Sequence, residues 1–155
     1  MDTVSSTSPL SLIVRPMESR DAQAVTVLIG QLGYERPMEA VVRWIERLHA
    51  DGENLAAYVA CVQEEVVGWI EVSIENCLQS PPTALIGGLV VKEGVRGLGV
   101  GRRLCEQAEV WSWQRSVDTL RVTSRNTRKG AHRFYLRDGY RLVKTWLVFE
   151  KKRPD

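Results

Sequence analysis

The sequence predicts a single domain of the α/β (α+β) class, with about four helices against a central, mixed and mostly antiparallel sheet of about six strands. Three observations predict this class. Runs rich in β-branched and aromatic residues alternate with apolar residues at helical spacing, one such run leads through a glycine-rich turn into a long helix, and another run follows that helix. A strand, a crossover helix and a second strand form a parallel pair, which makes the sheet mixed.

The individual elements follow from the apolar pattern and from the residues that begin and end helices. Ser19 is the expected N-cap of the first helix, which ends at Gly33. Pro81 and Pro82 are expected to interrupt the chain before the strand that leads into the glycine-rich turn. In chain order the sequence predicts a strand at 12–17, two helices that end at Gly33 and Asp51, a hairpin of strands 55–63 and 66–75, a strand at 84–92, a long helix, a strand at 119–124, a helix at about 129–137 and a strand at 140–150.

Length and composition indicate one folded domain at residues 12–155, after a short disordered lead-in at residues 1–11. Hydrophobic residues make up 44% and charged residues 26% of the chain, which is the balance of a globular protein rather than of a disordered or membrane protein. The first residues contain no apolar run long enough for a signal peptide or a membrane span. A cytoplasmic location is therefore expected.

The charge balance and the cysteine pattern argue against several classes of partner. Lys and Arg number 21 and Asp and Glu 19, so neither a nucleic acid nor a membrane surface is an expected partner. The basic residues 151–153 are interpreted as a solvated tail. Three cysteines form no CxxC pair and the two histidines have no metal-like partners, so neither a disulfide framework nor a metal site is expected.

The glycine-rich turn at residues 96–101, Arg-Gly-Leu-Gly-Val-Gly, carries a chemical signal. Its glycines allow successive backbone N–H groups to converge on one anion at a helix N-terminus, an array that suits a pyrophosphate. No Gly-Lys-Ser/Thr follows, which argues against a P-loop, and the GxGxG spacing differs from the dinucleotide-binding fingerprint. The alternative interpretation is that these glycines only build a tight turn.

Several motifs, taken together and in chain order, resemble the GNAT acetyltransferase superfamily. They are Leu89-Val90-Val91, Arg96-Gly97-x-Gly99-x-Gly101, Asn126 after the following strand, and Phe134-Tyr135 ahead of Asp138-Gly139-Tyr140. The resemblance covers nearly the whole chain and implies the GNAT fold, in which the parallel strands splay apart. Within the superfamily, residues 131–140 are similar to the aminoalkylphosphonate acetyltransferases, which acetylate small amines.

This resemblance implies that acetyl-CoA is the co-substrate and that it lies where the parallel strands splay. The pyrophosphate would meet the amides of the glycine turn, and Val91 would offer its N–H to the thioester carbonyl and stabilise the oxyanion. Asn126 would contact the pantetheine arm. The residues implied in cofactor binding are Leu89, Val90, Val91, Arg96, Gly97, Leu98, Gly99, Val100, Gly101, Arg102, Asn126 and Phe134.

Tyr135 matches the family position that protonates the departing CoA thiolate, because a phenol with a pKa of about 10 is protonated at neutral pH. The general base is less defined, since Leu85 and Gly88 stand where related enzymes carry carboxylates. Glu71 and Glu75, on one face of the preceding strand, are the nearest substitutes, and Glu35, between the first two helices, is another candidate. A solvated strand face is the alternative interpretation of Glu71 and Glu75.

The function implied is an N-acetyltransferase that moves an acetyl group from acetyl-CoA to a primary amine of a small molecule by direct attack. Two other functions stay open. One is a protein N-terminal or lysine acetyltransferase, and the other is a non-catalytic acyl-CoA binding or sensing module, which the absent central-strand carboxylate keeps in consideration. Five tryptophans, and the pairing of C-terminal strands common in the family, are compatible with a homodimer.

Overall fold

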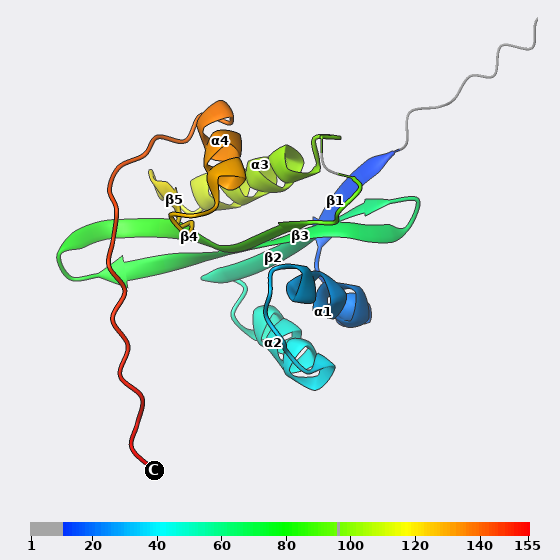
Figure 1. The fold of residues 1–155 in the computed structure, drawn as a ribbon, viewed down its shortest axis with the longest axis horizontal. Coiled ribbons are helices and arrows are strands. Elements are labelled where there is room, and N and C mark those ends of the chain that lie inside the picture. Colours follow the sequence, from blue (N-terminus) through cyan, green and yellow to red (C-terminus); the bar gives the residue numbers. More distant parts are fainter. Residues whose placement is uncertain (1–10, 96) are drawn as a thin grey trace, which may run out of the picture. The chain divides into compact units, whose positions relative to one another are not determined.

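The computed structural model describes residues 11–95 and 97–155, which divide into two compact units between Thr123 and Ser124. The first unit contains a five-stranded sheet in the order β1-β2-β3-β4-β5 (Figure 1). Neighbouring strands are antiparallel except β4 and β5, which are parallel, so the predicted fold class is confirmed. The strands are β1 (Leu12–Pro16), β2 (Leu55–Val62), β3 (Glu65–Cys77), β4 (Ser80–Val91) and β5 (Leu120–Val122).

Helices cover both faces of this sheet. Helices α1 (Ala22–Gln31) and α2 (Met38–Ala50) lie on one face, and α3 (Val100–Trp113) lies on the other (Figure 1). Each helix buries one apolar stripe because its apolar residues recur three and four positions apart. The buried side chains of the stripes are Val25 and Leu28 in α1, Val41, Ile45 and Leu48 in α2, and Val100, Leu104, Ala108 and Trp111 in α3.

The start of α1 differs from the prediction. Ser19 is not its N-cap, because a 3-10 turn at Ser19–Asp21 precedes the helix and Glu18 and Asp21 form a reciprocal capping box. The Asp21 carboxylate accepts the Glu18 N–H at 2.8 Å and two bonds from the guanidinium of Arg15 at 2.7 and 2.8 Å. Burial alone would raise the pKa of Asp21, but the hydrogen bonds from Arg15 and Glu18 lower it below its usual value. This pair ties α1 to β1.

The antiparallel strands form two successive hairpins. Gln63 and Glu64, both with positive φ, make the two-residue turn between β2 and β3, as the predicted hairpin requires. The predicted break at Pro81 and Pro82 is wrong, since both prolines lie inside β4. They are tolerated there because β5 pairs with β4 only from Ala84 onward, so that this part of β4 is an edge.

The second unit, residues 124–155, contains α4 (Lys129–Arg137), at the predicted place. The predicted closing strand at 140–150 is wrong, because the structure assigns neither strand nor helix to those residues. A strand needs a neighbour for its N–H and C=O groups, and among residues 124–155 there is no other strand to supply one. No helix among the described residues has the length and apolar character needed to cross a membrane.

Candidate functional site

The end of β4 has one edge without a neighbouring strand. The parallel pairing with β5 stops at Ile86, so residues 87–91 have no strand on that side among the described residues. The Lys92 N–H donates to the Val67 carbonyl of β3 at 2.7 Å, so Lys92 points its polar backbone groups toward β3. Along an antiparallel strand, residues that bond to the neighbouring strand alternate with residues that do not. The N–H and C=O groups of Leu89 and Val91 are therefore turned away from β3, toward the open edge.

A bulge in β4 accompanies this open edge. The register passes from Glu71 opposite Gly88 to Val72 opposite Ile86, so Gly87 is an extra residue in β4. A bulge bends its strand and increases its twist, which fits the loss of pairing with β5 immediately after Ile86. The splay of the parallel pair thus begins at Gly87.

Two side chains of β3 lie across the glycines of β4. A β-carbon at Gly87 would stand 2.5 Å from a carboxylate oxygen of Glu71, and one at Gly88 would stand 2.6 Å from the ring of Trp69. Any larger residue at either position would displace these side chains. The indole N–H of Trp69 is buried and has no hydrogen-bond partner within the described part of the chain. The two glycines therefore make the room in which Glu71 and Trp69 lie.

Glu71 has the properties of a proton acceptor. Burial raises the pKa of its carboxyl group above the usual value, and no hydrogen bond or ion pair offsets this among the described residues. Its oxygen lies over β4, whose far side is the open edge, and neighbouring strands are about 5 Å apart. Glu75 lies on the same face of β3 but is exposed, about 13 Å further along the strand.

The glycine turn has the backbone geometry expected of an anion site. Gly97 and Gly99 have φ angles of 87° and 79°, a region that L-residues with side chains disfavour, and Gly99 is the N-cap of α3. The N–H of Arg103 bonds to the Gly99 carbonyl at 3.0 Å, which is the first bond of the α3 ladder. The N–H groups of the three residues before Arg103 therefore have no acceptor within the helix itself. Leu98 is exposed, Val100 is buried, and Arg96 lies outside the described residues.

Gln31, the last residue of α1, joins that helix to the end of β4, and the sequence analysis missed it. Its side-chain amide donates from Nε2 to the Val91 carbonyl at 2.7 Å and accepts the Glu93 N–H on Oε1 at 3.0 Å. On the other edge, Lys92 bonds to β3 through its N–H and forms an ion pair with Glu65. The chain at residues 91–93 is therefore held from both sides.

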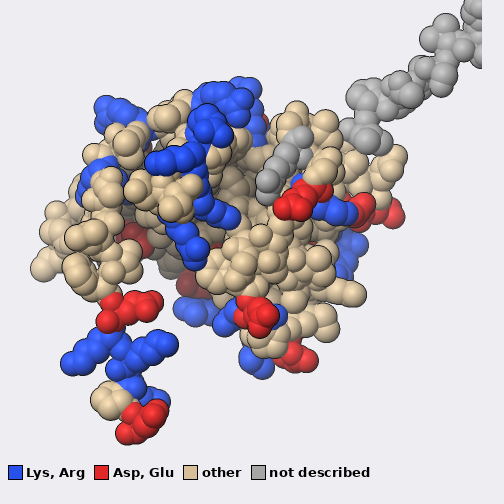
Figure 2. Space-filling model, in the orientation of Figure 1, with Lys and Arg blue, Asp and Glu red and all other residues tan. Residues whose placement is uncertain are grey.

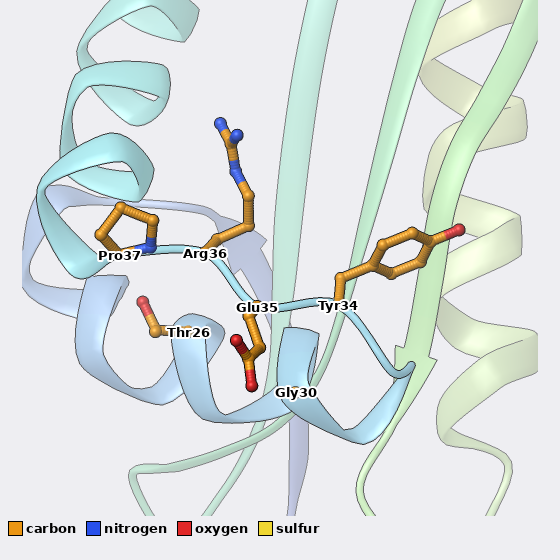
Figure 3. Close-up of a pocket in the computed structure, with 6 residues that line it drawn as sticks. All are labelled: Thr26, Gly30, Tyr34, Glu35, Arg36 and Pro37. Carbon is orange, nitrogen blue, oxygen red and sulfur yellow. The ribbon is translucent and has the colours of Figure 1, made fainter. Parts of the chain in front are cut away.

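A shallow hollow of about 490 Å³ lies between α1 and the loop that leads to α2 (Figure 3). The Glu35 carboxylate is turned toward Thr26 of α1, whereas the ring of Tyr34 points away from the hollow (Figure 3). Glu35 thus faces α1, and both Glu35 and Arg36 are exposed. The hollow is lined by Thr26, Gly30, Tyr34, Glu35, Arg36 and Pro37.

Three of the predicted site residues belong to the second unit. Tyr135 and Phe134 lie in α4 and pack edge to face, with ring centroids 5.3 Å apart. The ring of Tyr140 also packs edge to face on that of Tyr135, with centroids 5.6 Å apart, and the Tyr140 backbone N–H donates to the Tyr135 carbonyl at 3.0 Å. Asn126 is exposed in the segment before α4. The aromatic neighbours therefore restrict the ring of Tyr135.

The two units carry net charges of opposite sign, although the charges of the whole chain nearly balance. Residues 1–123 carry 16 acidic and 11 basic side chains, whereas residues 124–155 carry 3 acidic and 10 basic ones. Side chains of both signs appear on the face drawn in Figure 2. In α4, Lys129, Arg133 and Arg137 are four residues apart and so share one helix face. No cluster of three or more metal-ligating side chains occurs among the residues that the structure describes.

A sequence model of the acetyltransferase (GNAT) family matches residues 21–140, more than three quarters of the chain. The chain belongs to the GNAT acetyltransferase family. The predicted acetyl-CoA-dependent N-acetyltransferase activity, with acetyl-CoA as co-substrate, is thereby confirmed. The match includes β3, β4, the glycine turn and α4.

Solved structures support the same fold. An AAC(6')-Iy enzyme in complex with the bisubstrate analogue CoA-S-monomethyl-acetylneamine is 19% identical, with a TM-score of 0.80 over 92% of this chain and 99% of that one. A protein from Bacillus halodurans described as a transcriptional regulator is 23% identical, with a TM-score of 0.80 over 91% and 100%. Glucosamine-6-phosphate N-acetyltransferase from Arabidopsis thaliana is 17% identical, with a TM-score of 0.79 over 92% and 99%. At such identities these likenesses concern the fold.

The geometry of the glycine turn yields a prediction for CoA binding by this acetyltransferase. Gly99→Ala forces a β-carbon into the left-handed region, at a cost of about 1–2 kcal/mol, and moves the first amides of α3. We expect calorimetry to show CoA binding at least about 10-fold weaker. Gly33→Ala is the matched control, because Gly33 has a φ of 92° and follows α1, remote in sequence from the turn. CoA affinity of Gly99→Ala that stays at the wild-type value would contradict an anion site at Gly99.

Proposed function

We propose that this enzyme transfers the acetyl group of acetyl-CoA to a primary amine of a small molecule that carries several amino groups. The observation that carries the proposal is Glu71, a partly buried carboxylate with a raised pKa beside the open edge of β4. A thioester bound along that edge would have a base within reach of the attacking amine, directly or through one water. The sequence lacks the family's usual carboxylate on the central strand, and Glu71 takes its place.

In this proposal acetyl-CoA binds along the edge of β4 and at the glycine turn. The N–H groups of Leu89 and Val91 meet the carbonyl groups of the thioester and of the pantetheine arm, in the manner of a neighbouring strand. The first amides of α3 meet the pyrophosphate. Asn126 and Phe134 contact the pantetheine arm, and the basic face of α4 attracts the phosphates.

The reaction proceeds by direct attack. The acceptor ammonium first gives a proton to the Glu71 carboxylate, and the free amine nitrogen then forms a bond to the thioester carbonyl carbon. The oxyanion that develops is stabilised by a backbone N–H of β4. Collapse of the intermediate breaks the carbon–sulfur bond, and the Tyr135 hydroxyl donates its proton to the CoA thiolate. The second proton of the attacking nitrogen then passes to the Tyr135 phenolate, directly or through water, which restores the hydroxyl. Amide and free CoA are the products.

Charge supports a polycationic acceptor. The first unit, which contains Glu71, has five more acidic than basic side chains, and such an excess attracts ligands with several ammonium groups. Two solved structures with this fold are named for small amines, neamine in one case and glucosamine-6-phosphate in the other. Aminoglycosides are therefore our first choice of acceptor. Aminoalkylphosphonates, which carry a single amino group, are the alternative acceptor that the similarity of residues 131–140 to aminoalkylphosphonate acetyltransferases suggests.

The role of Glu71 predicts a change in the pH profile. An ionised carboxylate is needed to accept the proton, so kcat/KM of the wild type should fall as the pH drops through the raised pKa of Glu71. Glu71→Gln should lower kcat by about 10²-fold and remove that acid limb, with the same acceptor used throughout. Glu75→Gln decides between the two carboxylates. If only Glu75→Gln removed the acidic fall of kcat/KM, then Glu75 and not Glu71 would be the general base.

Tyr135→Phe tests the proton donor. The substitution keeps the ring, and so its packing against Phe134 and Tyr140, but removes the hydroxyl. We expect kcat to fall by about 10²-fold, with CoA affinity and thermal stability nearly unchanged. The measurement requires an assay in which chemistry is rate-limiting. An undiminished kcat there would make Tyr135 a packing residue and water the proton donor.

A screen of acceptors, with release of free thiol as the readout, tests the substrate class. Aminoglycosides and polyamines should show kcat/KM at least about 10-fold above amines with one ammonium group, and their KM should rise with ionic strength because salt screens the attraction. Peptides with a free N-terminus and lysine peptides belong in the same screen. Turnover of peptides alone would overturn the proposal, and CoA binding without turnover of any amine would favour the sensing module.

A further inference from the structure

Beyond the base and the acid, we propose that Gln31 is a positioning residue whose side-chain amide holds the β4 edge in the shape that binds acetyl-CoA. The inference rests on the proposed use of that edge by the thioester. It assigns a function in the reaction to α1, which otherwise only covers the sheet. The residue acts through the backbone of Val91 and Glu93.

The geometry of the bridge carries the proposal. In a parallel sheet, one residue donates its N–H to a carbonyl of the neighbouring strand and accepts the N–H two residues further on. The Gln31 amide does the same, since Nε2 bonds to Val91 O at 2.7 Å and Oε1 to Glu93 N at 3.0 Å. It therefore takes the place of a parallel neighbour just where β5 no longer pairs with β4.

The consequence concerns the direction of the Val91 amide. In a strand, the N–H and C=O of one residue point to the same side, so the bond to the Val91 carbonyl also fixes the direction of its N–H. Lys92, between the two bridged residues, is held to β3 by its own N–H and by the ion pair with Glu65. Without Gln31, β3 alone would hold this segment, and residues 91–93 could twist away from the open edge.

The same segment leads directly into the glycine turn. Gly94, with a φ of 88°, follows Glu93, and the N–H of Val95 bonds to the Lys92 carbonyl at 3.3 Å. The position of Glu93 thus sets where the turn to α3 begins. Gln31 would in this way position both the edge that meets the pantetheine arm and the loop that meets the pyrophosphate, so its loss should weaken CoA binding itself.

The test exploits the difference between an amide and a carboxyl group. In Gln31→Glu the ionised carboxylate can accept the Glu93 N–H but has no proton for the Val91 carbonyl. A protonated carboxyl group has one donor and one acceptor, as the amide does, and can restore both bonds. CoA affinity of this variant should therefore be at least about 10-fold below the wild type at pH 8 and should approach it as the pH falls toward the pKa of the introduced carboxyl group, about 4.3 for an ordinary Glu. Gln31→Met, which cannot titrate, should be weaker by the same factor throughout this pH range.

Matched controls and a second measurement make the outcome decisive. Gln23, exposed on the same helix, receives the same two substitutions, and neither should change CoA affinity. In the wild type the Glu93 amide should also exchange slowly with solvent, and Gln31→Met should lose that protection. Unchanged CoA affinity in Gln31→Glu at pH 8, or equal affinities of the Glu and Met variants at every pH, would overturn the inference.

The experiment separates this inference from the proposed function, because CoA binding is measured without an acceptor. Failure of the roles of Glu71 or Tyr135 would leave the Gln31 comparison intact. With acetyl-CoA and an active acceptor, Gln31→Met should raise KM for acetyl-CoA at least as much as it lowers kcat. A fall in kcat with unchanged KM and unchanged CoA affinity would contradict a role in holding the binding edge.

Discussion

The short pairing between β4 and β5 is the constraint on which the rest of this structure depends. Two strands that paired along their full lengths would satisfy every backbone group of β4 and leave none for a ligand. Here the pairing stops at Ile86, and the bulge at Gly87 lies where it stops. The polar groups of Leu89 and the N–H of Val91 then face an edge where acetyl-CoA can complete the hydrogen bonding, whereas the Val91 carbonyl already accepts a bond from Gln31.

An open edge in the middle of a sheet is unstable unless other contacts hold it, and the chain provides them from several distant segments. The Arg15–Asp21 pair fixes the start of α1 to β1, and Gln31 fixes the end of the same helix to β4. Lys92 is held to β3 on the opposite side. One helix thus connects the first strand of the sheet to the strand that carries the proposed binding edge.

The carboxylate of Glu71 shows how a small residue on one strand can prepare chemistry on another. The missing side chain at Gly87 leaves space that Glu71 occupies, and burial in that space raises its pKa. A buried carboxyl group without a partner destabilises the folded protein when it is ionised, and such groups occur preferentially at functional sites. The glycines of β4 are therefore as important to the proposed base as the acid itself.

The sequence by itself determined the fold class, the family, the hairpin of β2 and β3, the glycine turn, α4 and the pairing of Glu71 with Glu75 as candidates. These depend on apolar periodicity and on local motifs, which are properties of neighbouring residues. It did not predict that Pro81 and Pro82 lie within β4 or that residues 140–150 form no strand, because strand pairing depends on which neighbour is available. Only the tertiary structure distinguished partly buried Glu71 from exposed Glu75 and brought Gln31 to Val91, 60 positions away in the chain. The burial of a particular polar side chain and the contacts between distant residues arise when the chain packs, and no local pattern encodes them.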